Sequence, residues 1–344
     1  MTTRVIVSIG EVFTGCEPYN YKVSRNTATS RSRMLPAYIS HSDCVKHEMG
    51  EQHPECPLRI GAIRDHLLVK GLLDFMQSYD APLATDQQLG LAHSMEYVRE
   101  FADVAKMVPD GGYTQIDPDT QINTYSYQAA LRAAGAAVLA TDLVMTGKSS
   151  VAFCNVRPPG HHAEHAAAGG FCFFNNVAVG IRHAVDTYGL ERVALIDFDV
   201  HHGNGSEDIL RDDPHVLMCS IFEKNIYPFC GDVPRGQNMV NVGLPSRCGS
   251  KEFREAIEQH WLPALNAFQP QMVFISAGFD AHRDDDMGNL GLVEADFAWV
   301  TRLIVDVAKR YAQGRIVSCL EGGYVLSPLA RSAAAHIKVL IGAD

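Results

Sequence analysis

From residue 34 onward, short and continuously apolar runs alternate with longer helical patterns, and this alternation restricts the fold more than any other feature. Continuous apolar runs indicate strands that are covered on both faces, which is typical of parallel sheets. Strands that alternate with helices predict a mostly parallel sheet with helices on both sides. The predicted strands are residues 37–40, 151–156, 193–198, 216–221, 272–277 and 315–320.

The segments between these runs have helical periodicity. Residues 129–140 are rich in alanine, which forms helices well and allows close packing. The predicted helices are residues 58–68, 95–107, 125–145, 176–188, 251–268, 294–311 and 328–341. Residues 1–33 are instead polar and basic, so we expect a polar N-terminal extension over 1–33 and a single domain over 34–344. An organelle transit peptide has a similar composition.

The composition narrows the class of protein. The chain has 344 residues, of which 47% are hydrophobic, enough for the core of one large domain. No apolar run approaches the roughly 20 residues of a membrane span. The net charge of -11 argues against nucleic-acid binding. We therefore expect no membrane partner and no direct nucleic-acid partner. Nine cysteines without a Cys-x-x-Cys pair indicate free thiols in a reducing compartment, so we expect a cytoplasmic protein.

Reactive side chains follow four of the predicted strands. Asp197, Asp199 and His201 are spaced two residues apart, so in an extended chain they point to the same face. The carboxyl ends of parallel strands share one edge of the sheet, and ligands of open α/β folds bind there. We therefore expect these residues to meet the three other reactive segments, which are 157–162, 278–280 and 321–324.

Asp199, His201 and Asp280 make a plausible set of three metal ligands. Borderline divalent metals accept imidazole and carboxylate together, and three protein ligands leave a position for water and substrate. Each residue also has an ordinary structural interpretation when it is taken alone. Asp280 could cap a helix, and His201 could be a hydrogen-bonded core histidine.

The remaining reactive residues suit proton handling. His161 and His162 follow a rigid Pro-Pro-Gly turn, and imidazole titrates near neutral pH. Asp197 could accept a proton from His161 and so fix the tautomer of that ring. Tyr324 follows two glycines and could donate to a developing oxyanion. Without a metal nearby, the His pair could equally have a core or surface role, and Gly-Gly-Tyr could be a simple turn.

Five motifs in this order resemble the histone deacetylase family of the arginase/deacetylase superfamily: RPPGHHA, GGFCFFNN, DFDVHHGNG, GFDAHRDD and EGGY. Residues 41–63 resemble the opening of its class II branch. The resemblance implies a single domain with a mostly parallel eight-stranded sheet and helices on both faces. It also implies a zinc-dependent amidohydrolase that removes acetyl or other acyl groups from the side-chain amine of lysine in proteins or peptides.

The resemblance assigns roles to individual residues. His162 would act as general base and then as general acid, while His161, paired with Asp197, would stay mainly protonated or assist electrostatically. Tyr324 would hydrogen-bond the amide oxygen and then the oxyanion. The ligands of one catalytic Zn²⁺ would be Asp199, His201 and Asp280.

Further residues would form the substrate channel and a second metal site. His53 and Pro54 would lie at the mouth of a narrow acyl-lysine channel, which Gly170, Phe171 and Tyr227 would line. A structural K⁺ is also implied. Its ligands would be Asp197, the main-chain oxygens of Asp199 and His201, and Ser220 and Ile221.

Two positions separate branches of the family. Class I members have an acid where this chain has Asn204, so the asparagine matches class II and should leave His162 less strongly polarised. The polyamine-preferring branch has a glutamate near the position of Met287, and methionine cannot attract an ammonium group as a carboxylate does. We therefore expect acyl-lysine substrates. The alternatives are an acetylpolyamine amidohydrolase, an arginase-like ureohydrolase with two Mn²⁺ ions, and a non-catalytic acyl-lysine-binding module.

Overall fold

The apolar runs that were predicted as strands form the centre of one sheet. The computed structural model describes residues 34–344, and the predicted extension over 1–33 lies outside them. The strands of the sheet are β1 (Ala37–Ser40), β2 (Gln77–Asp80), β5 (Val151–Cys154), β6 (Val193–Asp197), β7 (Val216–Glu223), β8 (Met239–Leu244), β9 (Met272–Ala277) and β10 (Ile316–Leu320). Within the described residues these eight strands follow the order β2-β1-β5-β10-β9-β6-β7-β8, and all neighbours are parallel. The predicted eight-stranded, mostly parallel sheet is confirmed.

The two strands that the sequence did not reveal lie at the edges of the sheet. Every residue of β5, β6, β7, β9 and β10 is buried, because helices cover both of their faces. β2 is mostly exposed, and the middle of β8 is only half-buried. An edge strand does not need a continuous apolar sequence, so neither segment has the run that marks the central strands.

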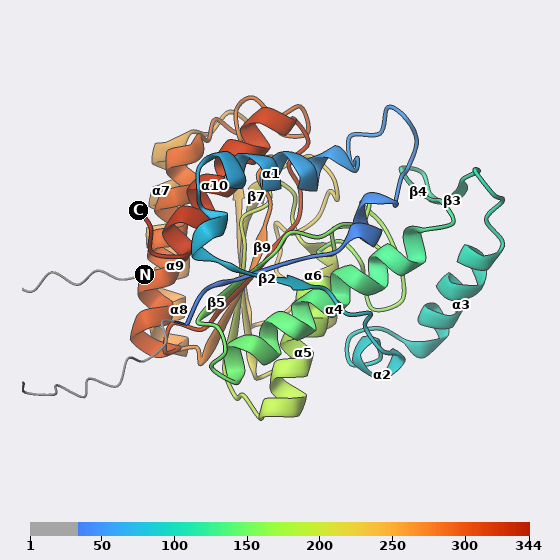
Figure 1. Cartoon of the computed structure of the whole chain (residues 1–344). Helices are drawn as coiled ribbons and strands as arrows, with labels where there is room; N and C mark the ends of the chain where they lie inside the picture. Colours follow the sequence, from blue (N-terminus) through green and yellow to red (C-terminus); the bar gives the residue numbers. More distant parts are fainter. Residues whose placement is uncertain (1–33) are drawn as a thin grey trace, which may run out of the picture. The chain divides into compact units, whose positions relative to one another are not determined.

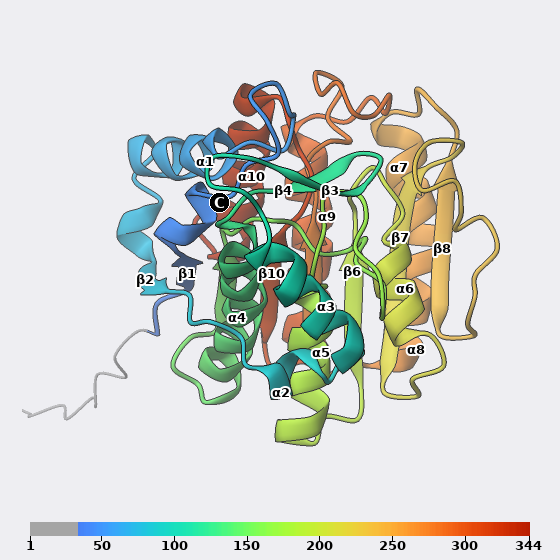
Figure 2. The ribbon, with the colours of Figure 1, turned by 90° about the vertical axis from the view of Figure 1, so that its right-hand side faces the viewer.

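Helices cover both faces of the sheet, as the alternation predicted (Figures 1 and 2). The helices on one face are α1 (Leu58–Val69), α7 (Ser250–Ala256), α8 (Leu262–Phe268), α9 (Glu294–Tyr311) and α10 (Leu326–Leu340). Those on the other face are α4 (Ser126–Met145), α5 (Asn176–Tyr188) and α6 (Asn204–Leu210), with α3 (Met95–Lys106) beside α4 and α2 (Asp86–Leu89) beside α3 and α5. The short 3-10 turns are Ser42–Val45 and Leu73–Phe75.

The helix predicted over 251–268 is interrupted in the middle. A π-helical turn, Ile257–Trp261, lies between α7 and α8. Pro263 is in the first turn of α8. Proline has no N–H to donate, and its ring displaces the carbonyl four residues earlier, so the preceding turn widens.

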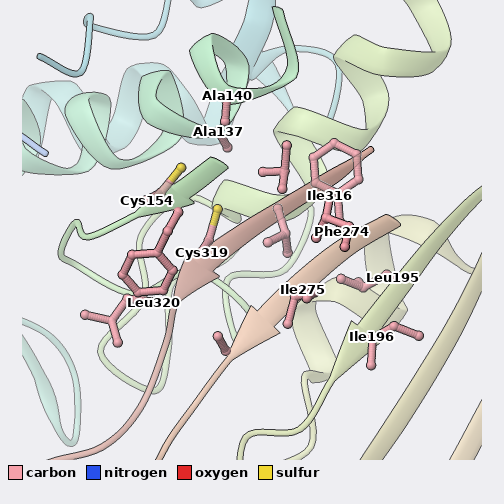
Figure 3. Close-up of a cluster of buried hydrophobic side chains, with 14 of the residues drawn as sticks. Ala137, Ala140, Cys154, Leu195, Ile196, Phe274, Ile275, Ile316, Cys319 and Leu320 are labelled. Atoms are coloured by element: carbon pink, nitrogen blue, oxygen red, sulfur yellow. The ribbon is translucent and has the colours of Figure 1, made fainter. Parts of the chain in front are cut away.

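The alanines of α4 bring this helix close to the sheet. Ala137 and Ala140 are fully buried and point toward β5 and β10, where Cys154 and Cys319 lie (Figure 3). By length and composition α4 could cross a membrane, but 67% of its most apolar window is buried inside the domain. Such burial is typical of a core helix.

A small antiparallel hairpin lies outside the main sheet and has no counterpart in the sequence predictions. It consists of β3 (Thr114–Asp117) and β4 (Thr120–Ile122). In Figure 2 it lies at the upper end of the sheet. The backbone N–H of Phe171 donates to Thr120 Oγ1 at 3.1 Å, which ties the hairpin to the predicted channel residue.

Candidate active site

The four reactive segments meet because their strands are neighbours in the sheet. β5, β10, β9 and β6 are consecutive in the strand order. Asp197 is the last residue of β6, and the segments 157–162, 278–280 and 321–324 follow the other three strands. All four strands are parallel, so these segments lie at one edge of the sheet.

Asp199, His201 and Asp280 come together as the predicted metal ligands. One ligand atom from each lies within 4.8 Å of the others, and all three side chains are buried. His201 Nδ1 is 3.0 Å from Asp199 Oδ1 and 3.3 Å from Asp280 Oδ2. Burial would lower the pKa of His201, but the two carboxylates outweigh it and raise this pKa to about 10. The set therefore attracts positive charge strongly.

The carboxylates fit a metal cation at this position. Asp280 Oδ1 accepts from the backbone N–H of Val200 at 2.9 Å, whereas Asp280 Oδ2 is buried without a hydrogen-bond partner among the described residues. The 3.3 Å contact of Asp280 Oδ2 with His201 is not aligned as a hydrogen bond. Burial and the charge of Asp199 raise the pKa of Asp280 to about 7. A buried carboxylate oxygen without a donor is costly, and a bound cation would satisfy it.

Glycine is required beside these carboxylates. A side chain at Gly322 would collide with oxygens of both Asp199 and Asp280. The N–H of Gly322 instead donates to Asp199 Oδ2 at 2.8 Å. The Gly-Gly of the last motif therefore allows the β10 segment to approach the proposed ligands closely.

The two adjacent histidines have different partners. His161 Nδ1 is 3.0 Å from Asp197 Oδ2, and His162 Nδ1 is 2.7 Å from Asn204 Oδ1. Burial opposes protonation of His161, but the charges of Asp199 and Asp197 raise its pKa to about 10. Burial and the positive charges of His161 and His201 hold the pKa of His162 well below its ordinary value. One ring thus keeps its proton while the other is free to accept one.

Aromatic rings surround the His pair and Tyr324. The centroid of the Tyr227 ring is 4.9 Å from that of His162, and the Phe171 centroid is 5.8 Å from that of Tyr324. His53 lies against Phe171 at 4.6 Å. Gly170 has a φ of +54°, and a side chain there would collide with the His162 ring. The predicted channel residues are therefore brought together around His162 and Tyr324.

Other predicted residues lie close by. Pro54 is half-buried next to His53, and Met287 is half-buried in the loop after β9. Asp285 holds this loop against the tyrosine, because its carboxylate accepts from the N–H groups of Met287 at 3.2 Å and Tyr324 at 2.7 Å. Ser220 and Ile221 belong to β7, in which Ser220 is the register partner of Asp197.

A buried ion-pair network supports the site and was missed by the sequence analysis. The carboxylate of Glu55 accepts from Arg157 Nε at 2.6 Å and from Arg59 Nη1 at 3.0 Å, and all three side chains are fully buried. Arg59 Nε also donates to the Gly323 carbonyl at 2.6 Å, and its guanidinium lies 4.8 Å from the centre of the Tyr324 ring.

The hairpin adds acidic residues that were also missed. His53 Nε2 donates to the Asp119 carbonyl at 3.2 Å. Burial raises the pKa of Asp119, and the hydrogen bond with Asp117 and the charge of that residue raise it further. A separate cavity of about 440 Å³ lies near the ends of β1 and β2 and is lined by none of the predicted site residues.

Comparison with known proteins identifies the family. Residues 53–340 match the histone deacetylase domain. The chain is 37% identical over 280 residues to a histone deacetylase-like amidohydrolase of Pseudomonas aeruginosa, covering 79% of this chain and 72% of that protein. It is 35% identical over 328 residues to human polyamine deacetylase HDAC10, covering 90% of this chain and 48% of that protein. The crystal structure of the HDA15 HD domain matches with a TM-score of 0.83 and 33% identity, over 90% of this chain and 89% of that one.

The chain therefore belongs to the histone deacetylase family, with the arginase/deacetylase fold. This membership supports a hydrolase that acts on acetylated substrates. The chain spans about half or less of the length of several curated relatives, including 21% of type-2 histone deacetylase 2 of Dictyostelium discoideum.

The buried network yields a stability prediction. Glu55→Gln should lower the free energy of unfolding by about 3–5 kcal/mol, because it leaves buried arginine charges uncompensated. Chemical denaturation measures this change. As a control, Asp103→Asn, which removes an exposed pair with Lys106, should leave stability unchanged.

The pH dependence has a defined sign. Burial alone would raise the pKa of Glu55, but the charge of Arg157, with the nearby imidazole of His47, holds this pKa well below its usual value. The contribution of Glu55 is therefore present above the unfolded carboxyl pKa of about 4.3 and is lost as the pH falls through the lower folded pKa. Equal stability of parent and Glu55→Gln at neutral pH would contradict the prediction.

Proposed function

We propose that this protein is a zinc-dependent amidohydrolase that removes acetyl or other acyl groups from the side-chain amine of lysine in proteins or peptides. One observation carries the proposal. The triad of Asp199, His201 and Asp280 lies beside a buried His pair, and Tyr324 follows β10, the neighbour of the strand β9 that leads to Asp280. Family membership supplies the hydrolase class.

The proposed metal ligands and the His pair divide the chemistry. Zinc held by the triad would polarise the acyl carbonyl and lower the pKa of a bound water toward about 7. His162, whose pKa is lowered by burial and neighbouring charge, takes the proton of the attacking water and returns it to the departing amine. His161 keeps its own proton, because Asp199 and Asp197 raise its pKa to about 10 against the effect of burial.

Tyr324 completes the proposed site. Its ring is held between Arg59 and Phe171, and its backbone is held by Asp285. The phenol would donate to the acyl oxygen as negative charge develops there. The proposed K⁺ beside Asp197 and the cytoplasmic location stay predictions.

A polyamine is the second candidate substrate. Burial raises the pKa of Tyr227, and the charges of Asp119 and Asp117 raise it further. Asp117 Oδ2 and the Tyr227 hydroxyl both lie beside Gly169, so acidic groups are near the proposed channel. These acids would attract an ammonium group, and one relative is named polyamine deacetylase HDAC10. A basic peptide would benefit in the same way, however, and Met287 supplies no charge. We therefore favour acyl-lysine.

The proposed metal site predicts about one equivalent of zinc per chain. His201→Ala and Asp280→Ala should each lose most of it, because two protein ligands hold the ion poorly. Elemental analysis of purified protein measures the metal. The control His215→Ala changes a histidine remote from the triad and should keep its zinc. Full zinc content in both ligand variants would disprove the site.

The proposed oxyanion donor predicts a catalytic defect without metal loss. Tyr324→Phe should keep its zinc and lower kcat on an acetyl-lysine peptide by roughly 10²–10³, the scale for one such donor. The matched control is Tyr311→Phe, whose hydroxyl donates to Asn266 Oδ1 at 3.1 Å. Tyr311 ends α9 just before β10 begins, at the opposite end of this strand from Tyr324. A parent-like rate for Tyr324→Phe would show that the phenol is not the donor.

The substrate preference is tested by direct comparison. Acetyl-lysine peptides should have a higher kcat/KM than acetylated putrescine or spermidine, measured at about 0.15 M ionic strength, where charges beyond about 8 Å are screened. Met287→Glu should raise kcat/KM for the acetylpolyamines a few-fold, since an exposed ion pair contributes roughly 0.2–1 kcal/mol. As a control, Val69→Glu adds the same charge at an exposed position of α1 and should leave kcat/KM for the acetylpolyamines unchanged. Better turnover of acetylpolyamines by the parent would move the protein to the polyamine branch.

A further inference from the structure

A hydrogen-bonded chain of three side chains leads from His162 away from the metal triad. His162 Nδ1 is 2.7 Å from Asn204 Oδ1, and Asn204 Nδ2 donates to Glu164 Oε1 at 2.9 Å. His162 and Asn204 are buried, and Glu164 is half-buried. An imidazole, an amide and a carboxylate therefore lie in sequence.

The order of these groups fixes the direction of every hydrogen bond. A carboxylate accepts and does not donate, so Asn204 must turn its NH₂ toward Glu164 and its oxygen toward His162. An oxygen facing Nδ1 requires a hydrogen on Nδ1. A neutral imidazole carries one ring hydrogen, so Nε2 of His162 is left with a free lone pair.

Without Glu164 this direction would not be fixed. The two ends of an asparagine amide have nearly the same shape, so the group can turn over within one cavity. A turned Asn204 would present its NH₂ to His162 Nδ1 and favour a hydrogen on Nε2. The imidazole would then be in the wrong tautomer to accept a proton at Nε2.

The main chain holds Glu164 firmly in place. Its N–H donates to the Ala167 carbonyl at 2.9 Å, and its own carbonyl accepts from His93 Nδ1 at 3.0 Å. The next residue is anchored as well, because the N–H of His165 donates to Asp208 Oδ2 at 3.1 Å.

We propose that Glu164 is a positioning residue that acts through Asn204 to hold His162 in the tautomer with hydrogen on Nδ1. Its effect on catalysis rests on the proposed deacylase function, whereas its effect on the tautomer does not. Glu164 itself touches neither the substrate nor the triad in this role.

The kinetic test uses two backgrounds. With Asn204 present, Glu164→Ala should lower kcat on an acetyl-lysine peptide roughly 10-fold, as loss of an orienting partner does, with KM and zinc content nearly unchanged. In an Asn204→Asp background, the aspartate faces Nδ1 with an oxygen whichever way it turns, and Glu164 becomes a like-charged neighbour. There Glu164→Ala should leave kcat unchanged or raise it. A fall by the same factor in both backgrounds would show that Glu164 only supports the loop.

A control variant separates orientation from anchoring. Asp208→Ala removes a neighbouring carboxylate that bonds the same segment but leaves the bond between Glu164 and Asn204 intact. The kcat of Asp208→Ala should stay within about twofold of the parent value, which is much less than the roughly 10-fold loss expected when an orienting partner is removed. A loss equal to that of Glu164→Ala would assign the effect to loop anchoring and overturn the inference.

A spectroscopic measurement tests the tautomer without any substrate. In zinc-loaded protein labelled with ¹⁵N-histidine, long-range ¹H–¹⁵N spectra report which ring nitrogen carries hydrogen, and the His162 signals are those missing in His162→Gln. The parent should show hydrogen on Nδ1, and Glu164→Ala should show a mixture. Hydrogen on Nε2 in the parent would overturn the inference even if the enzyme is active. A Glu164-dependent Nδ1 tautomer in a protein that does not hydrolyse acetyl-lysine would instead overturn the proposed function alone.

Discussion

The buried carboxylate of Glu55 connects the two halves of the site. Arg157, which donates to it, begins the segment that carries the His pair. Arg59, which also donates to it, bonds the carbonyls of Glu321 and Gly323 on the segment that carries Tyr324. Buried ions are tolerated only when their partners and hydrogen bonds are complete. The relative position of the two reactive segments is therefore tied to one fully buried ion-pair network.

The sheet explains why such a charged interior can form at all. Four adjacent strands are buried on both faces, so the apolar core ends where the reactive segments begin. Beyond that edge, carboxylates alternate with cationic groups. Glu321, for example, has a pKa that burial raises to about 7, while its oxygen accepts from the N–H groups of Gly160 and His161. The backbone of one reactive segment thus solvates the side chain of another.

The sequence could predict the centre of the fold and the proposed ligands, but not the parts that hold them. Central strands are recognisable because burial on both faces requires an apolar run. Strand alternation does not place the proposed ligands, however, because β6 ends at Asp197 and both Asp199 and His201 lie in the loop beyond it. The edge strands β2 and β8 lack such a run. The partners of Glu55 lie up to 102 residues away in the chain, so no local pattern could reveal the network. Glu164 was overlooked for the same reason, since its contact with Asn204 spans 40 residues.

The different partners of the two histidines have opposite electrostatic consequences. His161 faces the carboxylate of Asp197, and the carboxylates around it raise its pKa to about 10 although burial opposes this. His162 faces the neutral amide of Asn204, and burial with nearby positive charge lowers its pKa. The ring centroids are 4.0 Å apart, so a second imidazolium would be repelled by the first. A carboxylate in direct contact with His162 would favour that second charge. An amide oriented by a more distant carboxylate fixes the ring without adding charge beside it, which keeps one member of the pair neutral.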